Sequence, residues 1–119
     1  MLDYLPSGGK LRAFRRVVLS DGVLTLADAK SIALGHIISE GISYGDGQSV
    51  YYRSGEVARL EADGPIKAGE DVFATDEGRV SAKGKVLEGK ATTAAVKAGD
   101  VIEVAWNMPS EAETARDAT

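Results

Sequence analysis

Ile66-Lys67-Ala68-Gly69-Glu70-Asp71-Val72 is the first of two similar segments, and the second is Val96-Lys97-Ala98-Gly99-Asp100-Val101-Ile102. Each places Lys-Ala-Gly-acid between apolar residues that return to the core. Glycine permits the positive φ of a tight turn, and the acidic side chain can accept hydrogen bonds from nearby backbone N–H groups. The pattern therefore predicts two tight corners in a β domain, although many β proteins contain such turns without a special role.

Alternating apolar residues on both sides of these turns predict short strands. Ile102, Val104 and Trp106 share one strand face, and Val72 and Ala74 share another. Further candidate strands lie at residues 17–19, 37–44, 50–53, 57–61, 79–82 and 86–91. Turn signals that contain glycine separate these runs. Short strands at this spacing indicate a small barrel or sandwich.

The composition agrees with a turn-rich β protein. The chain has 119 residues, which fits one domain, and 14 of them are glycines. Glycine inside a helix costs about 1 kcal/mol relative to alanine, so this content favours turns over helices. One stretch leaves an alternative open. Asp28 could cap a short helix within residues 27–34, since Ala29, Lys30 and Ala33 are good helix formers.

The two ends of the chain differ from its middle. Pro6-Ser7-Gly8-Gly9 is a flexible break near the start, and the end of the chain is polar, without large apolar residues. We therefore expect an N-terminal arm at residues 1–16, a β domain at 17–107 and a flexible tail at 108–119. The predicted fold class is an all-β, single-domain barrel or sandwich. Alternatively, residues 11–19 are simply its first strand.

Several function classes are not favoured. The net charge of −4 does not suggest a nucleic-acid binder, and the lack of cysteine excludes disulfides and thiolate metal sites. No apolar run approaches the ~18 residues of a membrane span, and the start lacks a signal-peptide pattern. Ser7-Gly8-Gly9-Lys10 lacks the complete phosphate-loop pattern, and residues 70–77 lack that of a calcium loop. His36 lies among apolar neighbours as a strand residue. We predict no catalytic site, no metal and no cofactor.

The order of elements between and around the two turns carries a resemblance. Val72-Phe73-Ala74-Thr75-Asp76-Glu77-Gly78-Arg79-Val80 is a strand, a polar turn and a new strand, and residues 85–91 then lead into Thr92-Thr93-Ala94-Ala95 and the second turn. Over residues 64–106 this order resembles the capsid cement or decoration proteins of tailed phages. The resemblance implies a homotrimeric subunit, made in the host cytoplasm, that sits on the outer surface of the virion and bridges major capsid proteins.

Candidate contact residues lie mainly outside the resembling half. The arm offers apolar anchors and arginines that could pair with an acidic capsid surface, and tyrosines flank a glycine-rich turn; Trp106 would fill the core or an interface. The candidates for binding the capsid or a neighbouring subunit are Tyr4, Leu5, Leu11, Arg12, Phe14, Arg15, Arg16, Tyr51, Tyr52 and Trp106. Two other functions stay open: a small-molecule or glycan-binding β module, and an accessory β-barrel domain of a larger assembly.

Overall fold

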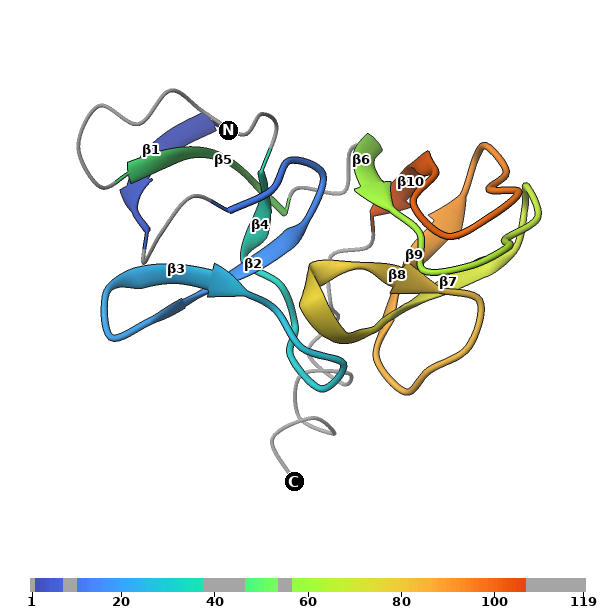
Figure 1. Cartoon of the computed structure of the whole chain (residues 1–119), viewed down its shortest axis with the longest axis horizontal. Helices are drawn as coiled ribbons and strands as arrows, with labels where there is room; N and C mark the ends of the chain where they lie inside the picture. Colours follow the sequence, from blue (N-terminus) through green and yellow to red (C-terminus); the bar gives the residue numbers. More distant parts are fainter. Residues whose placement is uncertain (1, 8–10, 38–46, 54–56, 107–119) are drawn as a thin grey trace.

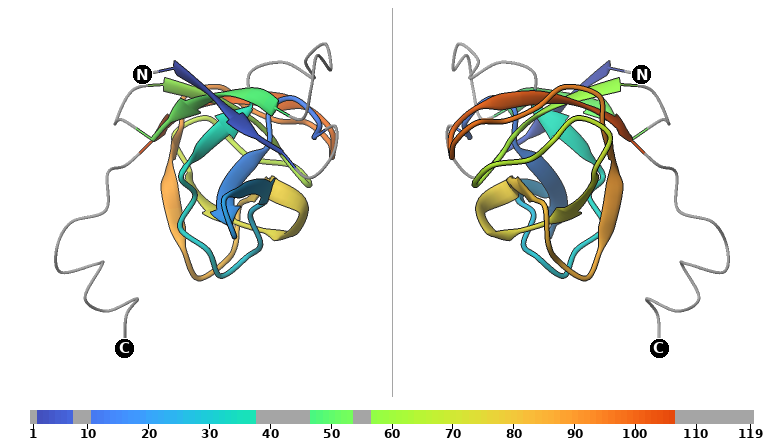
Figure 2. Two further views of the ribbon diagram at one scale, coloured as in Figure 1. Left: turned by 90° about the vertical axis from the view of Figure 1, so that its left-hand side faces the viewer. Right: turned by 90° about the vertical axis from the view of Figure 1, so that its right-hand side faces the viewer.

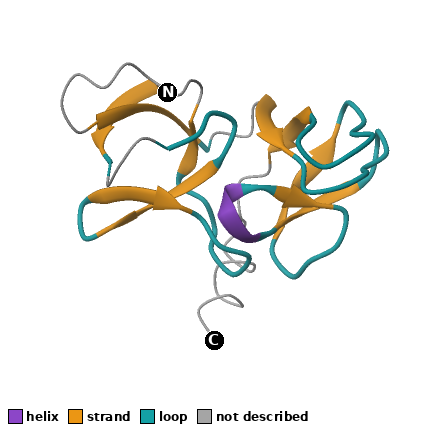
Figure 3. Cartoon of the chain, in the orientation of Figure 1, coloured by secondary structure: helices purple, strands orange, loops and turns teal. Residues whose placement is uncertain are grey.

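The computed structural model describes residues 2–7, 11–37, 47–53 and 57–106, with the backbone alone for residues 2–4. Their strands form two five-stranded antiparallel sheets, which lie side by side in Figure 1. The predicted all-β fold is confirmed. The described residues also form one short helical turn, η1 (Asp76–Gly78), which is coloured purple in Figure 3.

Each sheet is built from one half of the chain. The first half contributes β1 (Leu2–Pro6), β2 (Arg16–Ser20), β3 (Val23–Leu26), β4 (Gly35–Ile37) and β5 (Gly47–Tyr52). The second half contributes β6 (Val57–Glu61), β7 (Asp71–Ala74), β8 (Val80–Ser81), β9 (Leu87–Ala91) and β10 (Val101–Trp106). The sheet orders are β1-β5-β4-β2-β3 and β6-β10-β9-β7-β8.

Both sheets curl until their first and third strands meet. A parallel bridge between Ser7 and Leu24 joins the ends of the first sheet, and one between Ala62 and Val80 joins the ends of the second. The end-on views in Figure 2 show the strands wrapping around a central axis. We call the described residues of 2–53 barrel 1 and residues 57–106 barrel 2.

The two barrels have the same topology and the same register. β1 to β5 occupy the places of β6 to β10, and Gly35 pairs with Tyr52 as Gly89 pairs with Trp106. Likewise Arg16 pairs with His36 as Asp71 pairs with Lys90. The chain is therefore an internal structural duplication, although few residues are identical between its halves.

Each barrel has an apolar interior. Barrel 1 encloses Val17, Leu24, Ile37 and Val50, with Leu5, Leu11, Leu26 and Leu34 packed against them. The larger cluster fills barrel 2 and includes Leu60, Ile66, Val72, Val80, Ile102, Val104 and Trp106. Ala27 and Ala33 of barrel 1 belong to that second cluster. Small residues of barrel 1 thus pack into the core of barrel 2 at the joint.

The predicted strand faces of the second half are confirmed. Ile102, Val104 and Trp106 are buried in β10, and Val72 and Ala74 are buried in β7, as alternation of side chains across a strand requires. Residues 38–44 of the candidate strand 37–44 lie outside the described part of the chain.

The alternative of a helix over residues 27–34 is wrong. Asp28 forms a local turn instead: its carboxylate accepts hydrogen bonds from Lys30 N (2.9 Å) and Ser31 Oγ (2.8 Å). The hydrogen bond from Ser31 Oγ, together with that from Lys30 N, lowers the pKa of Asp28. Short polar side chains that bond their own backbone compete with helix formation in this way.

The described parts of residues 1–16 are built into the fold. β1 pairs with β5 along its whole length, and Leu5 and Leu11 pack on the core of barrel 1. Residues 108–119, expected to form a tail, lie outside the described part of the chain.

Candidate functional site

The most unusual chemistry of the chain lies at the joint between the barrels. In barrel 1, Arg16, His36 and Tyr51 are cross-strand neighbours on β2, β4 and β5. Because paired residues project to the same face of a sheet, they form one row. Arg16 and His36 meet barrel 2, whereas Tyr51 keeps 41% of its surface exposed.

Arg16 is fully buried at the centre of this joint. It donates hydrogen bonds to the carbonyl oxygens of Arg79 (3.0 Å, from Nε) and of Thr75 and Asp28. Burial lowers the pKa of its guanidinium, and the carboxylate of Glu88, 4.0 Å away, opposes this shift. Arg16 therefore ties β2 to the loops that flank η1.

Glu88 is the buried anion of the joint. Its carboxylate accepts hydrogen bonds from Arg53 (3.3 and 3.4 Å) and from Trp106 Nε1 (2.9 Å). The Arg53 guanidinium also lies 5.1 Å from the centre of the Trp106 ring, within the range of a cation–π contact. A buried charge is tolerated when it is paired and hydrogen-bonded, and Glu88 meets both conditions.

A second buried ion pair closes the other side of the joint. Arg15 bonds the carboxylate of Glu61 at 2.9 Å and the carbonyl of Glu77 at 2.8 Å. The backbone N–H of Glu61 also donates a hydrogen bond to the carbonyl oxygen of Phe14, 2.8 Å away. Phe14 has a positive φ of 64°, which turns that carbonyl toward β6.

His36 is buried between two aromatic rings. It stacks on Tyr51, with ring centroids 5.8 Å apart, and meets the edge of Trp106 at 5.4 Å. Desolvation lowers its pKa from 6.5 to about 4, and no described residue hydrogen-bonds to Nδ1. His36 is therefore neutral at pH 7 and packs as an aromatic spacer between the barrels.

This arrangement is suited to holding two barrels together. The carboxylate oxygens of Glu88 accept hydrogen bonds from Arg53 and Trp106, and the carboxylate of Glu61 accepts one from Arg15. Within the described ranges, no three His, Asp or Glu side chains gather so that they could hold a metal ion. None of the described helical segments is long and apolar enough to cross a membrane.

The structure divides the candidate contact residues into two groups. Arg15, Arg16 and Trp106 are buried, Leu5 and Leu11 pack on the core of barrel 1, and Phe14 lies in the joint. Arg12 and Tyr51 are exposed, and Tyr52 is partly exposed. The backbone of Tyr4 pairs with Ser49, while its side chain is outside the description. The candidates thus do not form one surface.

Sequence reasoning missed the members of the joint: Glu61, Glu88, Arg53 and His36. Glu88 follows the apolar Val86-Leu87, but strand alternation places it on the same face as the exposed Lys90, so the pattern did not indicate its burial. For Glu61 the signal pointed the wrong way, since strand alternation places it on the exposed face with Val57 and Arg59. Its partner Arg15 comes from the other barrel, which sequence alone does not bring near.

The paired turns have the geometry that the sequence predicts. Gly69 and Gly99 have φ of 90° and 96°. Glu70 accepts a hydrogen bond from Lys67 N (2.6 Å), and Asp100 accepts bonds from Val96 N (2.8 Å) and Lys97 N (3.2 Å). The two bonds lower the pKa of Asp100. A bridge between Ile66 and Ala95 holds the two turns side by side.

The fold therefore defines a class of protein: an all-β chain of two similar barrels that are joined by buried ion pairs. Among solved structures, it is similar to the N base of the head fiber gp8.5 of bacteriophage phi29, with a TM-score of 0.69 and 16% sequence identity. The similarity covers 92% of this chain and 100% of that one. No protein-family model and no curated protein sequence matches the chain. At this identity the likeness shows the shared fold.

Proposed function

We propose that this chain is a non-enzymatic structural protein of a bacteriophage head. The observation that carries the proposal is the fold shared with the N base of a phage head fiber over nearly the whole chain. The order of strands and turns over residues 64–106, which resembles phage decoration proteins, supports the same class. A fold alone hosts many functions, so the proposal rests on these two independent likenesses together.

Within that class, we propose that the chain binds the outer surface of the assembled head and bridges neighbouring major capsid proteins as a homotrimer. Two barrels held together by buried ion pairs suit this role, because a clamp must keep its contact surfaces at a fixed spacing. Binding the assembled state alone stabilises it by mass action. Repetition over a symmetric shell turns modest interfaces into high avidity. Arg12 and Tyr51 are the predicted contact residues whose described side chains are exposed.

Sedimentation tests this function directly. The purified chain is mixed with assembled, expanded phage heads that lack it and, separately, with unassembled major capsid protein. We expect saturable co-sedimentation with heads, little binding to the free subunit, and heads that withstand a higher temperature once they are decorated. Analytical ultracentrifugation of the chain alone measures whether it is a trimer before it docks.

Failure to co-sediment with any head would remove the proposal. Saturable binding of a glycan or another small ligand under the same conditions would favour the β module that the sequence also allows. Binding to free capsid protein and heads with equal affinity would retain attachment but contradict the clamp, because a clamp recognises the joint between assembled subunits.

A further inference from the structure

The internal duplication shows how one loop of this fold docks on a β-strand. In barrel 1 the turn Arg12–Arg15 carries the contact with barrel 2. The Phe14 carbonyl accepts the N–H of Glu61 on the outer edge of β6, while Arg15 pairs with the Glu61 carboxylate at 2.9 Å. Arg12 lies 3.9 Å from the same carboxylate. The turn thus recognises a strand edge that bears a carboxylate.

The same turn occurs again in barrel 2. Phe14 N–H bonds the carbonyl of Ile37 (2.8 Å), and Gly69 N–H bonds the carbonyl of Ala91 (2.7 Å). Ile37 pairs with Val50 as Ala91 pairs with Val104, so the two turns occupy equivalent places. Register therefore sets Lys67-Ala68-Gly69-Glu70 against Arg12-Ala13-Phe14-Arg15. Basic residues and alanines coincide at the first two positions, whereas Glu70, which bonds Lys67 N, stands where barrel 1 has Arg15.

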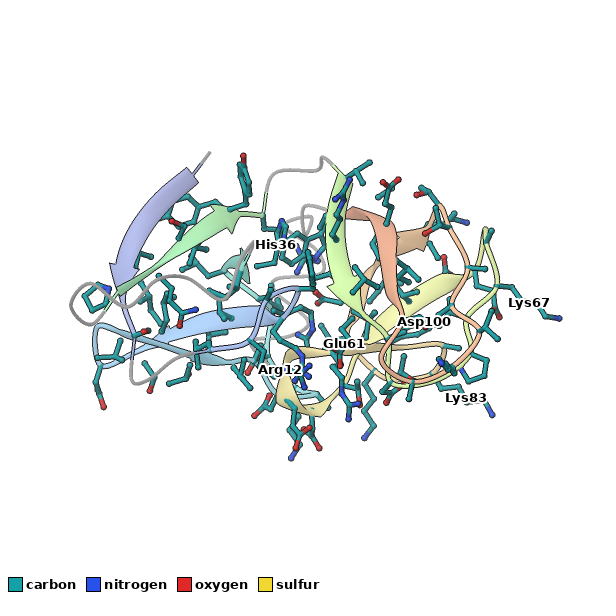
Figure 4. The ribbon with its side chains drawn as sticks, turned by 45° about the horizontal axis from the view of Figure 1, so that its top comes forward. Arg12, His36, Glu61, Lys67, Lys83 and Asp100 are labelled. Carbon is teal, nitrogen blue, oxygen red and sulfur yellow. The ribbon has the colours of Figure 1, made fainter. Side chains whose placement is uncertain are left out.

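In barrel 2 this turn faces away from the joint. Figure 4 shows Lys67 projecting at the end of barrel 2 that lies away from His36. Lys67, Ala68 and Gly69 are all exposed, and among the described residues none donates a hydrogen bond to the Gly69 carbonyl. The Gly69 carbonyl is equivalent to the Phe14 carbonyl, which accepts the Glu61 N–H in the joint. In barrel 2 this acceptor is thus available to another molecule.

The second turn enlarges this surface. Val96 is 80% exposed and Val101 42% exposed, and they flank the turn that contains Lys97. Glu70 and Asp100 bond their own turns, whereas Lys67 and Lys97 make no ion pair with the described residues. The surface of Lys67–Gly69 with Val96–Val101, here the paired-turn surface, therefore offers cations and apolar contacts together.

We propose that the paired-turn surface is a docking site for an exposed strand edge that bears a carboxylate, on the head protein to which the chain attaches. This inference rests on the proposed function for the identity of the partner. The Gly69 carbonyl accepts a backbone N–H of that strand, Lys67 and Lys97 pair with its carboxylates, and Val96 covers its apolar neighbours. Addition to a strand edge gives affinity through main-chain hydrogen bonds, and the charges give selectivity.

Charge reversal at the paired turns tests this assignment. Lys67→Glu and Lys97→Glu are each compared with Lys30→Glu, the same change at an exposed lysine of barrel 1. Binding to heads that lack the chain is measured by sedimentation at several salt concentrations, and a thermal melt checks each fold. We expect the two paired-turn variants to bind about tenfold more weakly. Lys30→Glu should bind like the parent chain.

Cross-linking identifies the partner independently. A photoreactive side chain at Ala98 should capture a peptide of the head protein from decorated heads. Equal binding by all three charge variants would overturn the inference while leaving head attachment intact. Capture of only a second copy of this chain would overturn it as well, in favour of self-association. A parent chain that binds no head would instead contradict the proposed function.

Discussion

At the scale of single residues, we expect Glu88 to contribute most to the stability of the joint. It is fully buried and neutralises Arg53 and Arg16 while it accepts the Trp106 N–H. Removing one partner of such a network leaves buried charges without compensation, which costs about 3 to 5 kcal/mol. We therefore expect Glu88→Ala to lower the free energy of unfolding by this amount, as measured by urea denaturation.

An exposed pair supplies the matched control for Glu88. Arg59 and Glu103 face each other on β6 and β10 at 3.9 Å, with side chains 67% and 44% exposed. Water screens such a pair, so Glu103→Ala should change stability by no more than about 0.5 kcal/mol. Similar losses in both variants would mean that burial does not govern the contribution of Glu88.

His36 gives the fold a dependence on pH. The pKa of His36 is about 4 in the folded chain against an ordinary 6.5, so between these values the unfolded state binds a proton that the folded state does not. Stability therefore rises with pH in this window and falls on acidification. We expect a loss of about 2 kcal/mol between pH 7 and pH 5. Chemical denaturation at a series of pH values measures it.

The variant His36→Phe separates this effect from that of the carboxylates. Phenylalanine keeps the ring contacts with Tyr51 and Trp106 and cannot bind a proton. Its stability should be nearly flat between pH 7 and pH 5. A slope as steep as that of the parent chain would assign the acid sensitivity to other groups.

At the scale of elements, two glycines mark where neighbouring strands cross closely. A β-carbon at Gly89 would lie 2.1 Å from the Ala105 carbonyl oxygen, and one at Gly35 would lie 2.1 Å from that of Tyr51. We expect Gly89→Ala to destabilise the chain by about 3 kcal/mol, because β9 must move away from β10 to admit the methyl group. Thermal melts measure the loss.

Gly64 is the control for that substitution. A β-carbon there meets nothing within 4 Å, and no positive φ is required of it. Gly64→Ala should therefore leave the melting temperature almost unchanged. If Gly89→Ala were equally silent, the close approach of β9 and β10 would not limit the side chain at this position.

The same scale shows what the sequence reveals and what it leaves out. Local chemistry is sufficient for the paired turns, since Gly69, Gly99 and their acids act within a few residues. It is also sufficient for the buried faces of β7 and β10. The joint is different, because Arg15 and Arg16 stand where β2 begins, beside Val17, but pair with carboxylates of the other barrel. An arginine at a strand start therefore gave no indication of burial.

At the scale of the whole molecule, the duplication explains both the shared and the divergent features. The halves keep register and topology, and they keep glycine at 35 and 89 and valine at 17 and 72. They differ where their environments differ. Arg16 and His36 of barrel 1 meet barrel 2, whereas Asp71 and Lys90 at the equivalent places form an exposed pair at 3.6 Å. Arg16 and His36 thus lie in the joint, whereas the equivalent Asp71 and Lys90 lie on the surface of barrel 2.

The joint should make the two barrels unfold as one unit. Ala27 and Ala33 of barrel 1 pack in the core cluster of barrel 2, and the buried partners of Arg16, Arg53 and Glu88 lie across the boundary. Opening either barrel alone would expose these charges without their partners, at a cost of several kcal/mol. We therefore expect one cooperative transition, with equal opening free energies in hydrogen exchange for the amides of Val50 and Val104. Two separate transitions, or barrel 1 opening well below barrel 2, would show that the joint is a contact between independent domains. In that case Glu88→Ala should shift only the domain it destabilises, whereas a single unit requires that the amides of both barrels shift together.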